Sequence, residues 1–181
     1  MSGIERVGRL LRPIRAGARR SRLATLPSVP AVIRSSPAFA DGAAMPAEYA
    51  GDGVGGNVSP PLRWDGVPAA TAALVLVIED VDVPLPRPLI HTVAVLPAGI
   101  DDLDEGALGA GAPGVRFLRT VLGRGYHGPR PIPGHGTHHY RFHVFALDAP
   151  VADDVTSVHA LRTGMKRSLI ARGLLTGTYR R

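Results

Sequence analysis

Three runs of apolar residues predict the main strands of this chain. Residues 73–79 (ALVLVIE) form the most apolar run, and its length and β-branched content favour a strand buried on both faces over a helix. Residues 90–96 are a second strand candidate, in which His91 shares a face with two valines. Residues 138–147 are a third, rich in aromatic and branched side chains. Weaker patterns predict shorter extended segments over residues 36–42, 57–64, 117–122 and 174–179.

One helix is predicted near the end of the chain. Apolar residues recur at helical spacing over residues 158–172, and Gly173 is suited to the position that follows a helix. Many short strands followed by one late helix are typical of a β-rich, two-sheet fold and not of alternating βαβ units. We therefore expect an all-β or α+β domain with a large antiparallel sheet, a smaller sheet and peripheral helices.

The segment from residue 125 to residue 147 combines a rigid loop with a strand. Its first half contains too many prolines and glycines for a helix or a central strand. In its second half, alternation puts His138 and Tyr140 on the face that becomes steadily more apolar. These two side chains then stand where the strand enters the core, beside a loop with free backbone N–H groups. This arrangement suits a small pocket for an anion, although such residues are also common as amphipathic strand ends.

Two carboxylates and another histidine also lie at predicted strand ends. Asp80 and Asp82 follow the buried strand, and His91 begins the next. If these ends converge on His138, a carboxylate orients each imidazole, and a charged imidazole with a tyrosine hydroxyl holds phosphate oxygens. The chain has no cysteine and no Gly-x-Ser-x-Gly elbow, so binding is favoured over catalysis. The alternative is a hydrolase or lyase with His91 and His138 as acid and base.

Five histidines within 17 residues raise the question of a metal site. No spacing among them matches a zinc motif, and strand alternation separates His138 from its neighbours. We expect most of them on the surface, with no metal and no cofactor. The five are His127, His135, His138, His139 and His143.

The positive charge of the chain is concentrated at its N-terminus. Residues 1–34 hold eight arginines and one acidic residue, whereas the 181-residue chain has a net charge of only +6. The domain itself is therefore close to neutral, which argues against nucleic-acid binding. The absence of an uninterrupted apolar core in this segment argues against an ordinary secretory signal, so we predict a cytoplasmic protein.

Residues 1–31 form a basic N-terminal arm and linker in this interpretation. Ile4, Val7, Leu11 and Ile14 fall on one side of a short amphipathic helix that Pro13 breaks. Three alternatives remain open and are ranked in this order: a disordered tail, a helix docked on its own domain or on a second subunit, and a membrane-surface helix. A homodimer is one form of the second alternative. Residues 32–181 are expected to fold and bind an anion without the arm.

Several separate motifs resemble the phosphatidylethanolamine-binding protein family, in its bacterial Raf-kinase-inhibitor-like branch. They occur in the family's order: NVSPPLRW from Asn57, DVDVP from Asp80, GYHGP from Gly125, and a final HHYRF. The resemblance implies a pocket for phosphate-bearing or phospholipid head groups, and partners such as kinases or proteases. The pocket residues that it implies are Asp80, Asp82, His91, Gly128, Pro129, His138 and Tyr140.

Three positions depart from the family pattern. Val81 and Val83 replace the usual proline and alanine beside the two aspartates, and Thr92 stands where a tryptophan commonly follows the histidine. The missing indole changes the expected size of the pocket. The basic arm has no counterpart in the family core.

Overall fold

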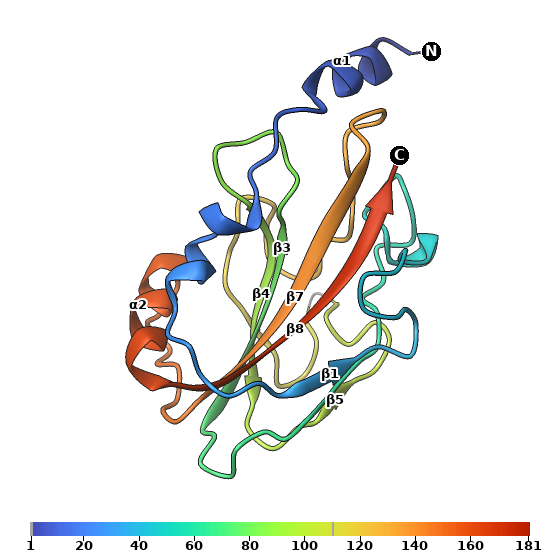
Figure 1. Cartoon of the computed structure of the whole chain (residues 1–181). Helices are drawn as coiled ribbons and strands as arrows, with labels where there is room; N and C mark the ends of the chain where they lie inside the picture. The colour runs from blue at the N-terminus through green and yellow to red at the C-terminus, as the bar shows by residue number, and fades with distance from the viewer. Residues whose placement is uncertain (1, 110) are drawn as a thin grey trace.

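Strand β3 (Ala73–Asp80) is the central strand of a five-stranded antiparallel sheet. The computed structural model describes residues 2–109 and 111–181 (Figure 1). The five strands occur in the order β6 (Arg116–Phe117), β4 (Leu89–Pro97), β3, β7 (Thr137–Leu147) and β8 (Leu169–Arg180). A smaller antiparallel sheet contains β1 (Ile33–Ser35), β2 (Leu62–Asp65) and β5 (Asp102–Leu103) in that order. The predicted two-sheet, β-rich fold is confirmed.

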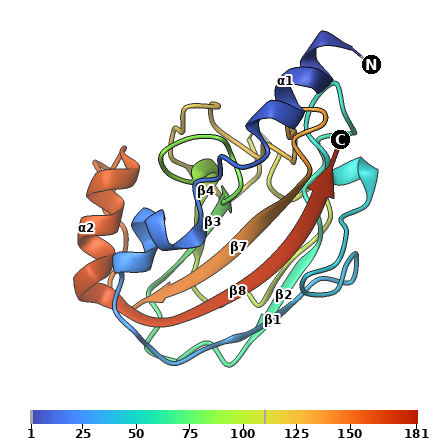
Figure 2. The same cartoon turned by 45° about the horizontal axis from the view of Figure 1, so that its top comes forward.

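The central strand is buried on both faces, as its sequence predicts. All eight residues of β3 are buried. Leu74, Leu76 and Ile78 pack with Trp64 of the smaller sheet in one core. The alternating valines of β3 contribute to a second core on the opposite face, which the helix α2 (Val158–Ser168) covers (Figure 2). The sheet thus lies between two apolar layers, and polar groups can approach β3 only near its ends.

The second helix is shorter than predicted. Residues 158–168 form α2, but Leu169 begins β8, which pairs with β7 over nearly its whole length. The apolar periodicity of residues 158–169 carries no sign that the chain turns into a strand there. Gly173, predicted to follow the helix, lies inside β8, where an added Cβ would be 2.8 Å from Cγ2 of Val32. Hydrogen bonding along β7 has overridden the local helical pattern.

Two of the weaker strand predictions are also shifted. The first strand of the smaller sheet is Ile33–Ser35, and not residues 36–42. The strand predicted over residues 117–122 is only the two-residue β6. Both are edge segments, whose extent depends on the partner strand and not on their own hydrophobic pattern.

The N-terminal arm is ordered and docked on its own domain. The helix α1 (Gly3–Leu11) begins with a capping box between Ser2 and Glu5 and ends before Pro13. It lies against the loop that precedes β7 (Figure 1). The following residues attach to the loop after β3, since the Ala16 N–H donates to the Val83 carbonyl over 3.0 Å. The structure therefore shows the second of the three alternatives, and not the disordered tail ranked first.

The docking face of α1 is not the predicted apolar stripe. Gly8 is the buried residue of the helix, and an added Cβ there would collide with the carbonyl oxygen of Pro133. Ile4, Val7 and Ile14 remain exposed. The missing side chain of Gly8 allows the backbones to approach closely, which the hydrophobic pattern does not reveal.

The end of the arm contributes to the core. Two short 3-10 turns, η1 (Ala18–Arg20) and η2 (Arg22–Thr25), lead from the arm toward the smaller sheet. Leu23 and Leu26 are buried in the core beneath α2. Core packing therefore continues across the expected boundary between residues 31 and 32, because Leu23 and Leu26 lie on its N-terminal side. A third 3-10 turn, η3 (Ala47–Tyr49), precedes the loop that faces the pocket.

None of the helices in the described part of the chain has the length and hydrophobicity needed to cross a membrane.

Candidate functional site

A cavity of about 540 Å³ opens at the end of the large sheet where β3 ends and β4 begins. Asp80, His91, Gly128 and His138, all predicted site residues, contribute to its wall. Tyr140 is buried next to this wall, with its ring in a T-shaped arrangement 5.4 Å from that of His91. Four of the seven predicted residues thus line one cavity and a fifth packs against it. They come together because β3, β4 and β7 are adjacent strands.

His91 presents an acceptor to the cavity. Its Nδ1 lies 2.9 Å from the backbone carbonyl of His127, which can only accept, so Nδ1 carries the proton. Burial lowers the pKa of His91 below its usual value, although the nearby Asp80 carboxylate opposes the shift. The imidazole is therefore neutral, with a lone pair on Nε2. That nitrogen is buried and has no hydrogen-bond partner among the described residues.

Tyr140 presents a donor beside it. Burial, together with the Asp80 carboxylate, raises the pKa of Tyr140 far above the range in which a phenol ionises at neutral pH. Its hydroxyl is buried and likewise lacks a hydrogen-bond partner within residues 2–109 and 111–181. Buried polar groups in proteins are almost always satisfied. An unpaired donor and an unpaired acceptor on two packed rings therefore mark a place for a polar ligand.

His138 is already fully engaged. Its Nδ1 lies 2.7 Å from Oδ2 of Asp80, and its Nε2 lies 2.6 Å from Nδ1 of His135. Nε2 of His135 donates in turn to the carbonyls of Leu11 and Ile14, 2.9 and 3.2 Å away. The pocket wall is thus linked to the N-terminal arm by a continuous chain of hydrogen bonds.

The number of protons in this chain follows from its geometry. One proton is needed between Asp80 and His138, one between the two imidazoles, and one on Nε2 of His135, because carbonyl oxygens only accept. Two neutral imidazoles and an ionised carboxylate together hold only two protons, one fewer than these three hydrogen-bonding positions require. The group formed by Asp80, His138 and His135 therefore binds three protons and has no net charge. Loss of one proton would leave two lone pairs opposed at 2.6 Å.

Asp82 is directed away from the cavity. Its carboxylate accepts from Arg15 over 2.8 Å and from the imidazole of His139 over 2.7 Å. Although burial opposes the shift, these hydrogen bonds lower the pKa of Asp82. The structure therefore places Asp82 where it anchors the arm beside the pocket, and not in the pocket wall.

The loop residues are held by backbone contacts. Gly128 donates its N–H to Oδ1 of Asn57 over 2.9 Å, and an added Cβ would collide with the Tyr49 carbonyl. The carbonyl of Pro129 accepts from Gly51 over 2.9 Å, and Pro129 is not part of the cavity wall. Asn57, the only described non-glycine residue with positive φ, is a wall residue that sequence reasoning missed. Its place in the NVSPPLRW motif was the available signal.

The clustered histidines occupy different environments. His143 is buried on the other face of the sheet, 3.0 Å from Glu79, and His139 is at the surface with Asp82. His135, His138 and His143 are buried, so the expectation that most of the five histidines lie on the surface is wrong. Nothing in the sequence context of His135 indicated its contact with the arm. Among residues 2–109 and 111–181, no group of three or more His, Cys, Asp or Glu side chains is arranged to hold a metal ion.

Two solved structures of bacterial proteins share this fold. The protein YbcL of Escherichia coli, described as a member of the mammalian PEBP family, superposes with a TM-score of 0.75 at 27% identity. The alignment covers 83% of this chain and 98% of YbcL. The protein CT736 of Chlamydia trachomatis superposes with a TM-score of 0.72 at 30% identity, with the same shares of the two chains covered. An inhibitor of carboxypeptidase Y, in complex with its proteinase, shares the fold alone, at 18% identity and a TM-score of 0.54.

Sequence comparison identifies the family. A UPF0098 protein of Pyrococcus abyssi is 31% identical over 157 residues, which cover 83% of this chain and 86% of the relative. The family profile described as Phosphatidylethanolamine-binding protein matches residues 35–180, which include every predicted pocket residue. The chain therefore belongs to the phosphatidylethanolamine-binding protein family.

Proposed function

We propose that this protein binds a small oxyanion of the phosphate type without transforming it. The observation that carries the proposal is the pair of buried, unpaired atoms at the cavity, Nε2 of His91 and the hydroxyl of Tyr140. The ligand is a free anion, a phospholipid head group or a group on a partner protein such as a kinase or a protease. All of these share the same oxyanion chemistry.

The protonation of the pocket dictates how the anion binds. The Tyr140 hydroxyl donates directly to an anionic oxygen, but neutral His91 offers only a lone pair. Asp80 and its two histidines have no net charge together, so the positive charge of the cavity wall comes from Arg130. A hydrogen bond from His91 to the anion requires one more proton, either on the ligand, as in a monohydrogen phosphate, or on His91. A proton on Nε2 gives a charge-assisted hydrogen bond.

Calorimetric titration with phosphate and with phosphoethanolamine tests the pocket. Tyr140→Phe removes one oxygen and leaves the ring in place, so we expect about tenfold weaker binding, the usual effect of losing one hydrogen bond to a charged group. Tyr179→Phe is the matched control, because Tyr179 lies in β8 and does not line the cavity. Equal affinities for the wild type and Tyr140→Phe would refute the pocket assignment. The two ligands separate recognition of the phosphate from recognition of the ethanolamine.

Acid–base catalysis by His91 and His138 has weaker support. A catalytic pair needs a free nitrogen on each ring, and both nitrogens of His138 are hydrogen-bonded inside the protein. A screen of phosphoesters, carboxylic esters and peptides should therefore show no rate above background. Turnover that disappears in His138→Ala would favour the hydrolase or lyase instead.

A further inference from the structure

The exposed apolar side chains of this protein are gathered in one region. Among the described residues, every large hydrophobic side chain that is exposed lies either in the arm or in the two loops that flank the pocket. Isolated exposed hydrophobic residues are ordinary, but a group confined to one region marks an interaction surface. We call this group the apolar rim: Ile4, Val7, Leu10, Ile14, Leu85, Val121 and Leu122.

The N-terminal arm contributes four of the seven residues of the rim, and three of these four lie in α1. Leu10 is 82% exposed, Ile4 57% and Val7 53%, whereas Gly8 faces the domain. The hydrogen bonds and close contacts that dock α1 involve Gly8, Arg12 and the Leu11 carbonyl, and they leave the side chains of Val7 and Leu10 exposed. Docking thus holds the exposed side chains of Ile4, Val7 and Leu10 toward solvent in a fixed orientation. A stripe that served only to attach the arm would be buried.

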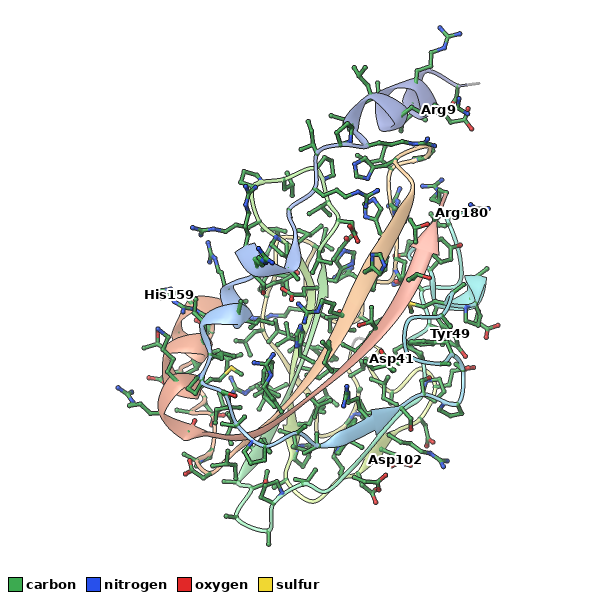
Figure 3. The ribbon with its side chains drawn as sticks, viewed as in Figure 1. Arg9, Asp41, Tyr49, Asp102, His159 and Arg180 are labelled. Carbon is green, nitrogen blue, oxygen red and sulfur yellow. The ribbon has the colours of Figure 1, made fainter. Side chains whose placement is uncertain are left out.

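The pocket rim and the arm face the same region of the molecule. Leu85 and Leu122 line the cavity, and Ile132 lines it next to the loop on which α1 rests. Figure 3 places Arg9 on α1 at the end of the molecule that also holds Arg180 of β8, far from Asp102 of β5. A flat partner that covers the stripe of α1 would therefore lie beside the mouth of the cavity.

The charge around the stripe selects the partner. Arg6 and Arg9 of α1 are exposed, and neither forms an ion pair with another described residue. The single acidic residue of the arm, Glu5, is occupied in the capping box of α1. An apolar stripe flanked by free arginines is typical of helices that lie in the interface of an anionic bilayer. A second copy of the chain would bring two strongly basic arms together, which charge repulsion opposes.

We propose that α1 and the apolar rim form a docking surface for an anionic lipid bilayer, with the pocket mouth turned toward the head groups. The stripe of α1 inserts at the boundary between head groups and acyl chains, and the arginines contact lipid phosphates. The surface does not depend on whether the pocket is occupied. Its apolar residues and the pocket atoms are different groups, so each can be altered without the other.

Sedimentation with sucrose-loaded vesicles tests the surface directly. We expect the full chain to bind vesicles of phosphatidylcholine with phosphatidylglycerol, to release them at high salt, and to ignore vesicles of phosphatidylcholine alone. Val7→Gln/Leu10→Gln should abolish binding. Both side chains are exposed and glutamine favours helices, so this variant should keep the wild-type circular dichroism spectrum and urea midpoint.

Charge variants give a matched pair. Arg6→Gln/Arg9→Gln should weaken vesicle binding on the order of tenfold. Lys166→Gln/Arg167→Gln removes the same amount of positive charge from exposed positions of α2. This control variant should change vesicle binding little. Tyr140→Phe should bind vesicles like the wild type, which separates a failure of this surface from a failure of the anion pocket.

Three results would overturn the proposal. The first is no binding of the full chain to anionic vesicles at low salt. The second is vesicle binding that Val7→Gln/Leu10→Gln leaves intact. The third is the absence of vesicle binding together with a dimer, detected by analytical ultracentrifugation, that Val7→Gln/Leu10→Gln dissociates. This result would show that the rim binds a second copy of the chain.

Discussion

At the scale of single residues, the chemistry of the pocket depends on where its protons are held. His91 and Tyr140 have pKa values that burial moves in opposite directions, and both side chains are neutral as a result. Asp80, His138 and His135 share three protons and have no net charge. An anion that enters is therefore met by one donor and one acceptor from these residues, and Arg130 of the cavity wall carries a fixed positive charge.

This distribution predicts proton uptake on anion binding. Burial places the pKa of His91 below 6.5 in the free protein, and a bound anion raises it. The association constant should therefore increase as the pH falls through the pKa of the complex and level off below that of the free protein. Sulfate is the suitable ligand, because its own charge is constant between about pH 5 and pH 8, the range in which histidines titrate.

A variant that cannot titrate provides the control. His91→Gln offers an amide donor without a charge change, so its sulfate affinity should vary less with pH than that of the wild type. Identical pH profiles for the two proteins would show that His91 does not take up the proton.

His135 is expected to matter for stability although it does not line the cavity. It is fully buried, and His135→Ala would leave Nε2 of His138 and two arm carbonyls without a partner. Each such unsatisfied group costs about 1–3 kcal/mol. Urea unfolding of His135→Ala should therefore show a decrease of at least this size in the free energy of unfolding. His159→Ala, at an exposed position of α2, should change the free energy of unfolding by less than about 0.5 kcal/mol. A similar small effect of both variants would mean that the contact with the arm contributes nothing.

At the scale of elements, the junction of α2 and β8 is where local pattern and tertiary pairing disagree. The helix stops at Ser168, and eleven of the next twelve residues pair with β7. Ala31 and Val32 pass beside β8, and the Val32 N–H donates to the Arg172 carbonyl over 3.0 Å. The close approach of this segment requires a residue without a side chain at position 173.

Two glycine substitutions test this assignment. Gly173→Ala should destabilise the protein by about 1–3 kcal/mol, because the new methyl group would lie 2.8 Å from Val32 and 3.1 Å from Arg34. Gly164→Ala, in the middle of α2 with no atom within 4 Å, should stabilise it by about 0.5–1 kcal/mol. If thermal unfolding showed that both variants stabilise the protein, or that both destabilise it, the assigned boundary between helix and strand would be contradicted.

At the scale of the whole molecule, the N-terminal arm has two structural roles. Residues 2–20 dock on the loops around the pocket through hydrogen bonds such as that from Arg15 to the Thr137 carbonyl, 2.9 Å long. Residues 21–26 belong to the core, since Leu23 and Leu26 pack under α2 and the Ser21 hydroxyl donates to the buried Glu79 over 2.6 Å. The two parts should respond differently to deletion.

Two truncations separate these roles. Removal of residues 2–14 should leave a cooperatively unfolding domain, because the buried leucines and Ser21 remain. Removal of residues 2–30 should lower the free energy of unfolding by at least about 4 kcal/mol, since two buried leucines are lost and each contributes about 2–5 kcal/mol. Equal urea midpoints for the two truncations would show instead that residues 32–181 form an independent unit, as the sequence suggests.

Local sequence was sufficient for the central strands and for four of the residues that line the cavity. The apolar run of β3 and the alternation in β7 determine which side chains are buried, because the hydrophobic effect acts on every residue of a strand in the same way. The motifs around Asp80, His91 and Tyr140 identified the family and the strand ends. Neighbouring strands then had to bring those ends together.

Only the tertiary structure decided the features that depend on long-range contacts. The start of β8 is set by pairing with β7, and the docking of α1 by the missing side chain of Gly8. The burial of His135 is set by carbonyls more than 120 residues away in the chain. Hydrogen bonds are directional and act over about 3 Å, so they appear only when the folded backbone brings their partners into place, whereas hydrophobic periodicity is already present in the unfolded chain.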